Sequence, residues 1–405
     1  MKRLSIVLVS FTVILLLCGF VARAPDVKYF TLYYGNQKVV VTDRTLRPQW
    51  FNADSYQDFT NGQSIYRRAE SATSISKDFP EIHKILKRIE REVEVPVFDG
   101  HINFDPARHE KFWVTGASRG IEMDTEAVSR EILAALRTRT YADIIIQTKE
   151  IPHKTENEII SKIGLRGQYS TRFDDDNQSR SANIERSALC FNALTLMPGE
   201  VLSFNRTVGP RTSARGYEEA KIIIDGEFVP GIGGGVCQTS TTLFNAAIVS
   251  GLTVVESHNH SLPISYVPLG RDAMVSSAVD LVIKNNTGSP AYFEAGLENE
   301  TKVFFKIYGE KLGGKKVNVV TEVIEKPLEI EVVGDTPADT SGFRKIIIED
   351  GYPARFVKTY LQTFDGGRLV SRKLLRKSSY KGKTEIIKYE EIPLTCAETP
   401  DIINM

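Results

Sequence analysis

The chain has 405 residues, more than one ordinary hydrophobic core contains, and this length predicts two to four domains. Hydrophobic residues make up 41% of the chain and charged residues 25%, a composition that excludes an intrinsically disordered protein. The 51 basic and 51 acidic residues cancel, so no overall positive charge favours nucleic acid, and we expect no nucleic-acid partner.

The amino terminus predicts a membrane anchor. Two basic residues precede an apolar run over residues 4–22, which has the length and flanking charge of an export signal or a single membrane span. Pro25 would directly follow a cleavage site at Ala24, which fits a cleaved signal poorly. We therefore expect residues 1–24 to form an uncleaved single-pass anchor in the cell membrane, with the rest of the chain extracellular. Secretion after signal cleavage is the alternative.

Residues 28–150 predict a small α+β domain. The segment begins with a hairpin-like pair of strands around Gly35-Asn36, and helices are predicted over Pro80–Val93 and Asp124–Arg137. The strand-turn-strand-helix order is similar to that of the YoaR-like peptidoglycan-binding domain, and this resemblance implies binding to wall glycan or stem peptide. A spacer between the membrane and the next domain is the alternative interpretation.

The stretch from Gly231 to Asp272 contains the densest group of chemically useful residues. Its glycine triplet, Gly233–Gly235, predicts a sharp turn into a helix that starts near Cys237. In a first helical turn, unpaired backbone N–H groups and the helix dipole favour negative charge, which lowers the pKa of a thiol. Cys237 is therefore a candidate nucleophile, and a small core residue is the alternative.

His258 and His260 follow a short predicted strand at the spacing that puts both side chains on one face of extended backbone. Either imidazole is a candidate base for Cys237. Asp272 or Asp280 is a candidate carboxylate to orient that imidazole. The residue types and their order thus predict a nucleophile, a base and an orienting acid.

Three further possibilities surround the thiol. Gln238, next to Cys237, is a candidate oxyanion donor. A zinc site would use Cys237, His258 and His260, but no fourth ligand is evident, so we expect no metal and no cofactor. A Cys190–Cys237 disulfide would instead remove the thiol from chemistry.

Three strands are predicted after this stretch, over residues 279–284, 291–295 and 302–308. The turns between them contain asparagine, glycine and glutamate, so we expect the strands to pair consecutively and antiparallel. With the preceding helix they predict a central α+β domain.

The central segment resembles the VanW family, proteins associated with vancomycin-resistance clusters and Gram-positive cell envelopes. The resemblance spans residues 164–312 and includes the motifs PGEVLSFN, GGGVCQTSTTLFNAA and HNHSLPISYVPLGRDA. It implies an envelope setting and leaves the chemistry open. The resemblance leads us to expect a basic residue directly before His258, and Ser257 at that position departs from it.

Residues 318–392 predict a β-rich module of alternating strands and glycine turns. The module is similar to a G5 domain, and the resemblance implies binding to polymers that contain N-acetylglucosamine. Its basic residues are candidates to face anionic wall polymers, and charges that only keep a thin β-module soluble are the alternative. They are Arg368, Arg372, Lys373, Arg376, Lys377, Lys381 and Lys383.

Together these patterns predict a multidomain α+β protein with a membrane anchor, a small α+β domain, a central VanW-like domain with an antiparallel sheet, and a C-terminal G5-like module. We expect an envelope-anchored accessory factor in wall binding or remodelling, whose partners are peptidoglycan or its stem peptides and the membrane. The alternative is a cysteine-dependent amidase or acyl-transferase that acts on stem peptides. The sequence does not define the oligomeric state.

Overall fold

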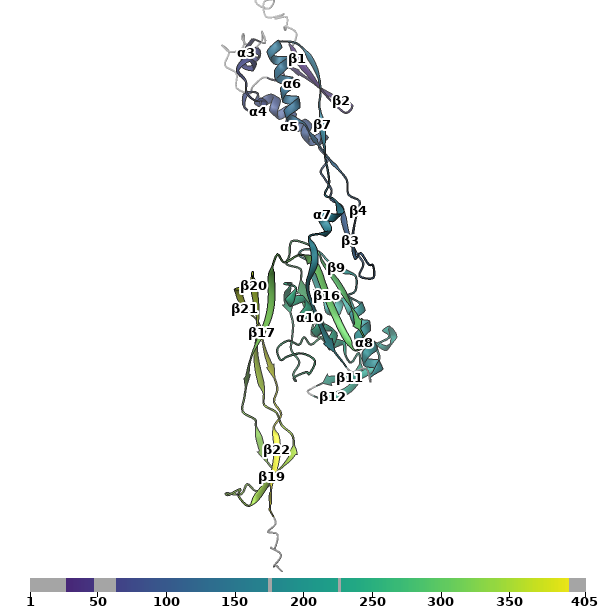
Figure 1. The fold of residues 1–405 in the computed structure, drawn as a ribbon, viewed down its shortest axis with the longest axis vertical. Coiled ribbons are helices and arrows are strands. Elements are labelled where there is room, and N and C mark those ends of the chain that lie inside the picture. Colours follow the sequence, from purple (N-terminus) through teal and green to yellow (C-terminus); the bar gives the residue numbers. More distant parts are fainter. Residues whose placement is uncertain (1–26, 47–62, 174–176, 225–226, 393–405) are drawn as a thin grey trace, which may run out of the picture. The chain divides into compact units, whose positions relative to one another are not determined.

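The computed structural model describes most of the chain (Figure 1). The described residues are 27–46, 63–173, 177–224 and 227–392. The expected anchor over residues 4–22 lies outside them. In these described ranges, no helix combines the length and the apolar composition needed to cross a bilayer.

Contacts divide the chain into two compact units. The first unit contains residues 1–101 and 114–155, and the second contains residues 102–113 and 156–405. By their contacts, residues 102–113 belong to the second unit, and they lie within the range 28–150 predicted for the small domain.

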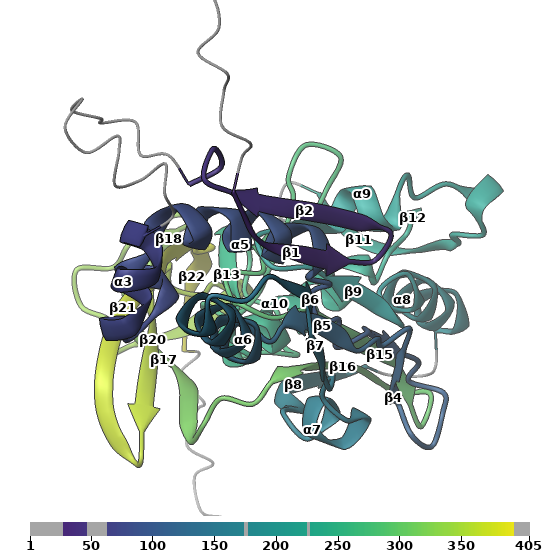
Figure 2. The same cartoon turned by 90° about the horizontal axis from the view of Figure 1, so that it is seen from above.

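The first unit is an α+β fold with a three-stranded sheet. Strand β1 (Lys28–Tyr34) pairs antiparallel with β2 (Gln37–Thr42) and parallel with β6 (Ala142–Ile145). Helix α6 (Thr125–Thr138) contacts β1 and β6, as Figure 2 shows. The hairpin around Gly35 and the helix near residues 124–137 are present as predicted, and Asp124 caps that helix.

Further helices and strands complete the described part of this unit. They are α3 (Gln63–Ser71), α4 (Ile75–Asp78), α5 (Pro80–Val93), β5 (Gly120–Met123) and β7 (Thr148–Ile151). Strands β5 and β7 form a separate antiparallel pair. Helix α5 has the bounds that the sequence predicts and buries Ile82, Leu86 and Ile89, which recur at helical spacing.

Residues 102–113, which form the tip of the hairpin of β3 (His101–Phe104) and β4 (Phe112–Thr115), make aromatic and charged contacts within the second unit. Phe112 meets the rings of Tyr292 and Tyr308 at centroid distances of 5.1 and 5.8 Å. Lys111 pairs with the buried Glu294 at 2.5 Å. These contacts explain why the tip of the hairpin packs with strands almost two hundred residues later in the chain.

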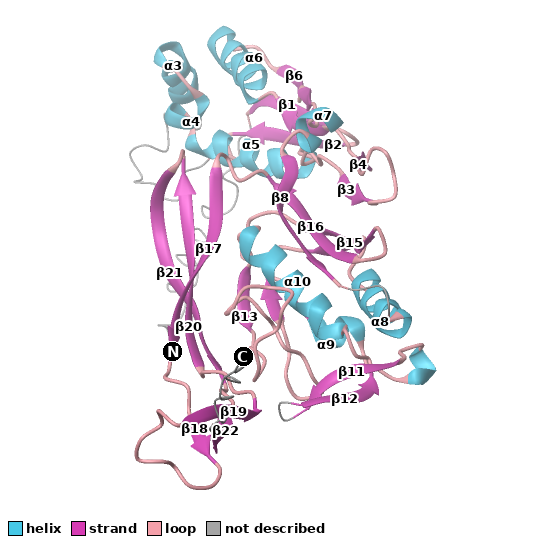
Figure 3. Ribbon diagram, turned by 60° about the horizontal axis from the view of Figure 1, so that its bottom comes forward, coloured by secondary structure: helices cyan, strands magenta, loops and turns pink. Residues whose placement is uncertain are grey.

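The second unit is built on a four-stranded antiparallel sheet in the order β8-β16-β15-β9. The strands are β8 (Ile163–Arg172), β16 (Lys302–Glu310), β15 (Ala291–Glu298) and β9 (Leu194–Leu196). Helices α8 (Gln178–Leu189) and α10 (Val236–Val249) pack against this sheet and against each other (Figure 3). The hydrophobic core of the unit lies between the sheet and these helices.

One strand prediction was wrong in its pairing. Strand β14 (Val282–Lys284) does not join β15 but lies between β10 (Val201–Ser203) and β13 (Thr253–Glu256) in a second sheet. It also starts later than predicted, at Val282, which pairs with Ser203, the last residue of β10. The Asp280 side chain instead accepts hydrogen bonds from Ser203 Oγ and the Asn205 N–H at the start of the short helix α9 (Phe204–Val208). Asp280 therefore caps α9 and does not belong to β14.

A hairpin of β11 (Glu219–Ile224) and β12 (Glu227–Ile232) leads into the glycine turn before α10. Gly234 lies so close to β11 that a Cβ there would be 2.7 Å from the backbone of Ala220 and Lys221. Asn183 on α8 donates to the carbonyls of Gly234 and Glu218 at 3.0 and 2.9 Å. The turn that starts the Cys237 helix is thus fixed from two sides.

The C-terminal segment is β-rich, as predicted. The strands β17 (Lys315–Glu325), β20 (Arg355–Asp365) and β21 (Arg368–Tyr380) form one antiparallel sheet. A smaller sheet contains β18 (Ile330–Val332), β22 (Glu385–Glu391) and β19 (Phe343–Glu349). The short elements α7 (Glu156–Ile160) and the 3-10 helix η2 (Ser213–Arg215) complete the unit.

Replacing Gly234 by alanine is expected to lower the free energy of unfolding by about 1–3 kcal/mol, because the new methyl group meets backbone atoms rather than a flexible side chain. Gly288→Ala is the matched control, since a Cβ at Gly288 meets open space, and its effect should stay below about 1 kcal/mol. Urea denaturation followed by circular dichroism measures both. Equal midpoints for the two variants would contradict this account of the turn.

Candidate active site

Helix α10 carries Cys237 and is buried on nearly every side. Polar residues line it, and each is fully buried and hydrogen-bonded: Thr239, Ser240, Thr241, Thr242 and Asn245. Buried hydroxyls and amides destabilise a fold unless they are hydrogen-bonded. The partners that these residues need therefore determine which segments pack next to the helix.

The main target of these polar residues is the segment from Arg271 to Ala273. Ser240 Oγ donates to the Ala273 carbonyl at 2.6 Å, and the Ala273 N–H donates to Thr241 Oγ1 at 2.9 Å. Asn245 Nδ2 donates to the Arg271 carbonyl at 2.7 Å. The helix that bears the cysteine therefore also clamps the backbone on both sides of Asp272.

Asp272 and His260 form a buried pair. Asp272 Oδ2 accepts hydrogen bonds from His260 Nδ1 at 2.8 Å and from the His260 backbone N–H at 2.6 Å. The aspartate is 1% exposed and the histidine 5%. Because an ionised carboxylate only accepts, Nδ1 carries a proton and Nε2 is the nitrogen left for the thiol.

The thiol of Cys237 completes the group at the start of α10, where it is half-buried and not in a disulfide. Burial alone would raise its pKa, but the hydrogen bond and the charge of His260, with a further contribution from Arg211, lower that pKa below its usual value. Burial likewise opposes protonation of His260, yet bonds to Asp272 and Cys237 raise its pKa to about 9. These shifts favour a thiolate–imidazolium pair at neutral pH.

Other side chains shape the surroundings of the thiol. Arg211 lies against the Gly233 turn and donates to Asn205 Oδ1 at 2.5 Å, which holds its positive charge near Cys237. Burial and the neighbouring thiol raise the pKa of Tyr266, so its phenol stays neutral. Sγ of Cys237 lies 3.3 Å from the Val275 carbonyl, to which the neutral thiol donates.

Three of the six candidate residues, Cys237, His260 and Asp272, lie together, and the side chains of the other three contact different groups. His258 is half-exposed and contacts Glu256 at 3.3 Å. Asp280 caps α9, as described above. Gln238 uses both amide donors on Thr171 Oγ1 and the Arg172 carbonyl, and its oxygen accepts from Arg180 at 2.5 Å. The Gln238 side chain therefore has no spare donor for an oxyanion.

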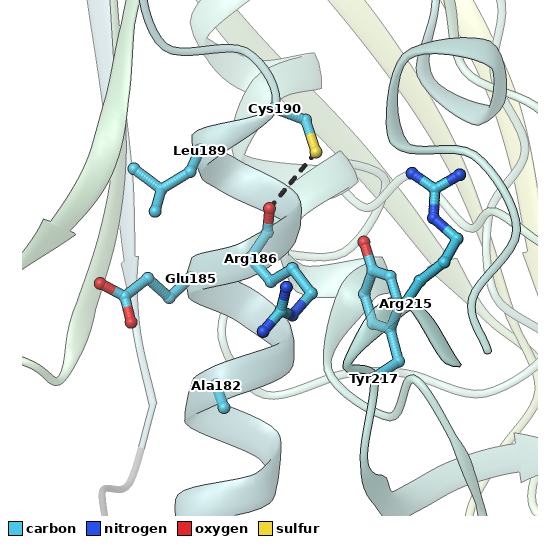
Figure 4. A pocket seen from close by; sticks show the side chains of 7 residues that line it. All are labelled: Ala182, Glu185, Arg186, Leu189, Cys190, Arg215 and Tyr217. Carbon is cyan, nitrogen blue, oxygen red and sulfur yellow. Dashed lines mark hydrogen bonds between the residues drawn. The ribbon is translucent and has the colours of Figure 1, made fainter. Parts of the chain in front are cut away.

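A depression of about 460 Å³ lies beside α8 and contains the other described free thiol, Cys190 (Figure 4). Arg186, Arg215 and the buried Tyr217 also line it. Cys190 donates to the Arg186 carbonyl at 3.4 Å, and burial raises the pKa of this thiol. The two thiols thus have opposite tendencies to ionise.

Sequence reasoning missed two residues that contact Asp272 from β21. Tyr380 donates to Asp272 Oδ1 at 2.6 Å, and Arg376 lies 3.5 Å from the same oxygen. Arg376 was expected among exposed charges, but its side chain is only 10% exposed and also donates to Ser257 Oγ. The one signal in the sequence is the alternate spacing of Arg376, Ser378 and Tyr380, which puts them on one face of a strand.

Comparisons with known proteins identify the family. The sequence profile described as "VanW like protein" matches residues 179–308. The chain is 33% identical over 225 residues to "Uncharacterized protein YoaR" of Bacillus subtilis (strain 168), covering 54% of this chain and 71% of YoaR. The chain belongs to the VanW family. It is also 28% identical over 150 residues to "Vancomycin B-type resistance protein VanW" of Enterococcus faecalis (strain ATCC 700802 / V583), covering 35% of this chain and about half, 54%, of that relative.

The matched VanW segment contains Cys237, His260 and Asp272 but ends before β21. A solved structure, "Crystal structure of HP0197-G5", is 16% identical and covers 18% of this chain and 95% of that chain, with a TM-score of 0.14. A score this low carries no argument about fold, so the G5 likeness of the C-terminal sheets stays a prediction.

Cys237 is expected to react with iodoacetamide at pH values below the usual thiol pKa of about 8.5, because His260 stabilises its thiolate. Cys190 is the internal control, since its pKa is raised instead. Peptide mapping by mass spectrometry measures both alkylation rates in one sample. His260→Ala should move the alkylation of Cys237 to higher pH, because burial then dominates. Equal reaction of both thiols at pH 6, or no effect of His260→Ala, would argue against the ion pair.

Proposed function

We propose that this VanW family member is a cysteine-dependent acyl-transfer enzyme of the cell envelope that acts on amide bonds of peptidoglycan stem peptides. The observation that carries the proposal is the buried, hydrogen-bonded pair of His260 and Asp272 beside the Cys237 thiol, whose pKa His260 lowers. A thiol, an imidazole and an orienting carboxylate in this order are the parts of a covalent acyl-transfer site.

The first half of the reaction follows from these three residues. The Cys237 thiolate attacks the carbonyl carbon of the amide and forms the C–S bond of a tetrahedral intermediate. His260, protonated in the resting pair, gives its proton to the departing nitrogen, so that the C–N bond breaks and a free amine leaves. The product is a thioester on Cys237 with a neutral imidazole beside it.

The second half regenerates the enzyme. The neutral Nε2 of His260 takes a proton from water, whose oxygen attacks the thioester carbonyl; the C–S bond then breaks and a carboxylic acid leaves. An amine in place of water gives a new amide, which would make the enzyme a transferase. Asp272 keeps its charge throughout, because hydrogen bonds from His260 and Tyr380 overcome the effect of burial and lower its pKa.

The start of α10 supplies a donor for the oxyanion. The N–H groups of Val236 and Gln238 donate to Gly233 and Gly235, whereas the Cys237 N–H has no hydrogen-bond partner within the described part of the chain. Such an N–H, next to the attacking sulfur and at the positive end of a helix, suits a developing negative charge. The nearby charge of Arg211 supports the same role.

The substrate class rests on the family and not on the geometry. The relative from Enterococcus faecalis is named for vancomycin resistance, and the resemblance implies an envelope setting. The expected anchor over residues 4–22 would keep the site on the outer side of the membrane, and stem peptides are found on that side. An accessory factor that binds peptidoglycan without chemistry is the second candidate, favoured only by the domain resemblance.

The test incubates the full-length protein with purified sacculi and identifies released or rearranged stem peptides by liquid chromatography and mass spectrometry. Cys237→Ala is expected to lower product formation by about 10³-fold or more, because no other group replaces the nucleophile. Cys190→Ala is the matched control and should retain wild-type activity. Unchanged products with Cys237→Ala would rule out the proposed reaction. No products from any form, together with cosedimentation with sacculi, would favour the binding role.

A further inference from the structure

We infer that the C-terminal sheet is part of the catalytic site, with Tyr380 and Arg376 as positioning residues that hold Asp272 and, through it, His260. The inference rests on the proposed function and deepens it. Both residues lie on β21, outside the segment that the VanW profile matches. A catalytic constellation would thus depend on a module that the family match does not include.

Tyr380 occupies the side of Asp272 that His260 leaves open. His260 bonds to Oδ2, and the Tyr380 hydroxyl donates to Oδ1 at 2.6 Å. The same hydroxyl accepts the Gly270 N–H at 2.7 Å, so its one proton is directed at the carboxylate. Burial and the charge of Asp272 raise the pKa of Tyr380, which therefore remains a donor. With both oxygens bonded, the carboxylate has one orientation.

Arg376 supplies a positive charge near Asp272 and donates further hydrogen bonds to the loop that contains Asp272. Its Nη2 donates to the carbonyls of Gly270 and Asp272 at 3.1 and 2.7 Å, and its guanidinium lies over the Phe244 ring of α10 at 5.2 Å. A buried carboxylate is unfavourable unless paired, and Asp272 has a cation on each side. Arg376 thereby ties the aspartate to the helix that carries the nucleophile.

Further hydrogen bonds join β21 and the residue that follows it to the loop of His260. Asn259 Nδ2 donates to the Ser379 carbonyl at 2.8 Å, and the Lys381 N–H donates to the Ser261 carbonyl at 2.9 Å. These two bonds flank His260. On the aspartate loop, Thr359 of β20 donates to the Gly270 carbonyl at 2.9 Å. The sheet therefore holds the loops of both His260 and Asp272.

Simple docking of one module on another would also produce contacts here, but the two roles differ in their chemistry. Docking depends on ring packing and shape, which Tyr380→Phe preserves. Positioning depends on the hydroxyl, which that variant removes from a buried carboxylate. Tyr360→Phe is the matched control in the same sheet, because its hydroxyl interacts with the exposed Glu322 and not with Asp272.

The experiment measures the pH dependence of Cys237 alkylation in the full-length protein, which needs no substrate. Tyr380→Phe is expected to shift the profile upward by about one pH unit, so that the rate at pH 6 falls about tenfold, because a less ordered imidazole stabilises the thiolate less. The other charged or titratable groups that surround the pair include Arg180, Arg211, Tyr266 and Arg376, and all four are unchanged in this variant. Tyr360→Phe should follow the wild-type profile. Coincident profiles for Tyr380→Phe and Tyr360→Phe would overturn the inference.

A second pair of variants tests the arginine if Tyr380→Phe folds poorly. Arg376→Lys keeps a cation and should retain more of the wild-type alkylation profile than Arg376→Gln, with Arg372→Gln, whose partner is Glu322, as the control. Equal profiles for all three would contradict the inference. With stem-peptide substrate, Tyr380→Phe should lower kcat more than it changes KM. A shifted alkylation profile without any turnover would leave the positioning role standing and remove the proposed reaction.

Discussion

The candidate active site depends on one buried negative charge, the carboxylate of Asp272. A carboxylate that is 1% exposed must be neutralised and fully hydrogen-bonded, or the fold would be strongly destabilised. Its partners come from two distant parts of the chain: His260 from the loop after β13, and Tyr380 and Arg376 from β21. Satisfying this one group joins the loop, the helix and the C-terminal sheet around the thiol.

The same constraint explains the unusual composition of α10. A helix buried on nearly all sides is normally apolar, yet this one carries Ser240, Thr241 and Asn245 in its interior. Each of them bonds the backbone on either side of Asp272. The motif that follows the glycine triplet therefore encodes both the position of the cysteine and the support of its distant carboxylate.

Much of this site could be predicted from local sequence, and the rest could not. The glycine turn, the helix start and Cys237 follow from local rules, and His260 and Asp272 were among the candidates. The choice of His260 over His258 depends on the folded structure, in which Asp272 contacts His260 and Glu256 contacts His258. Tyr380 lies 108 residues from Asp272, and only the packing of β21 on the core brings them together. The predicted pairing of β14 with β15 was wrong because strand pairing also depends on contacts between distant parts of the chain.

The thiolate–imidazolium pair depends most directly on the protonation state of His260. Imidazole resonances of isotopically labelled full-length protein can be followed by NMR from pH 5 to 10, with His260→Gln used for assignment. We predict that His260 stays protonated through neutral pH and titrates near pH 9, and that Cys237→Ala lowers this value because the thiolate partner is lost. A His260 that is already neutral at pH 7, or that titrates identically without Cys237, would contradict the proposed thiolate–imidazolium pair.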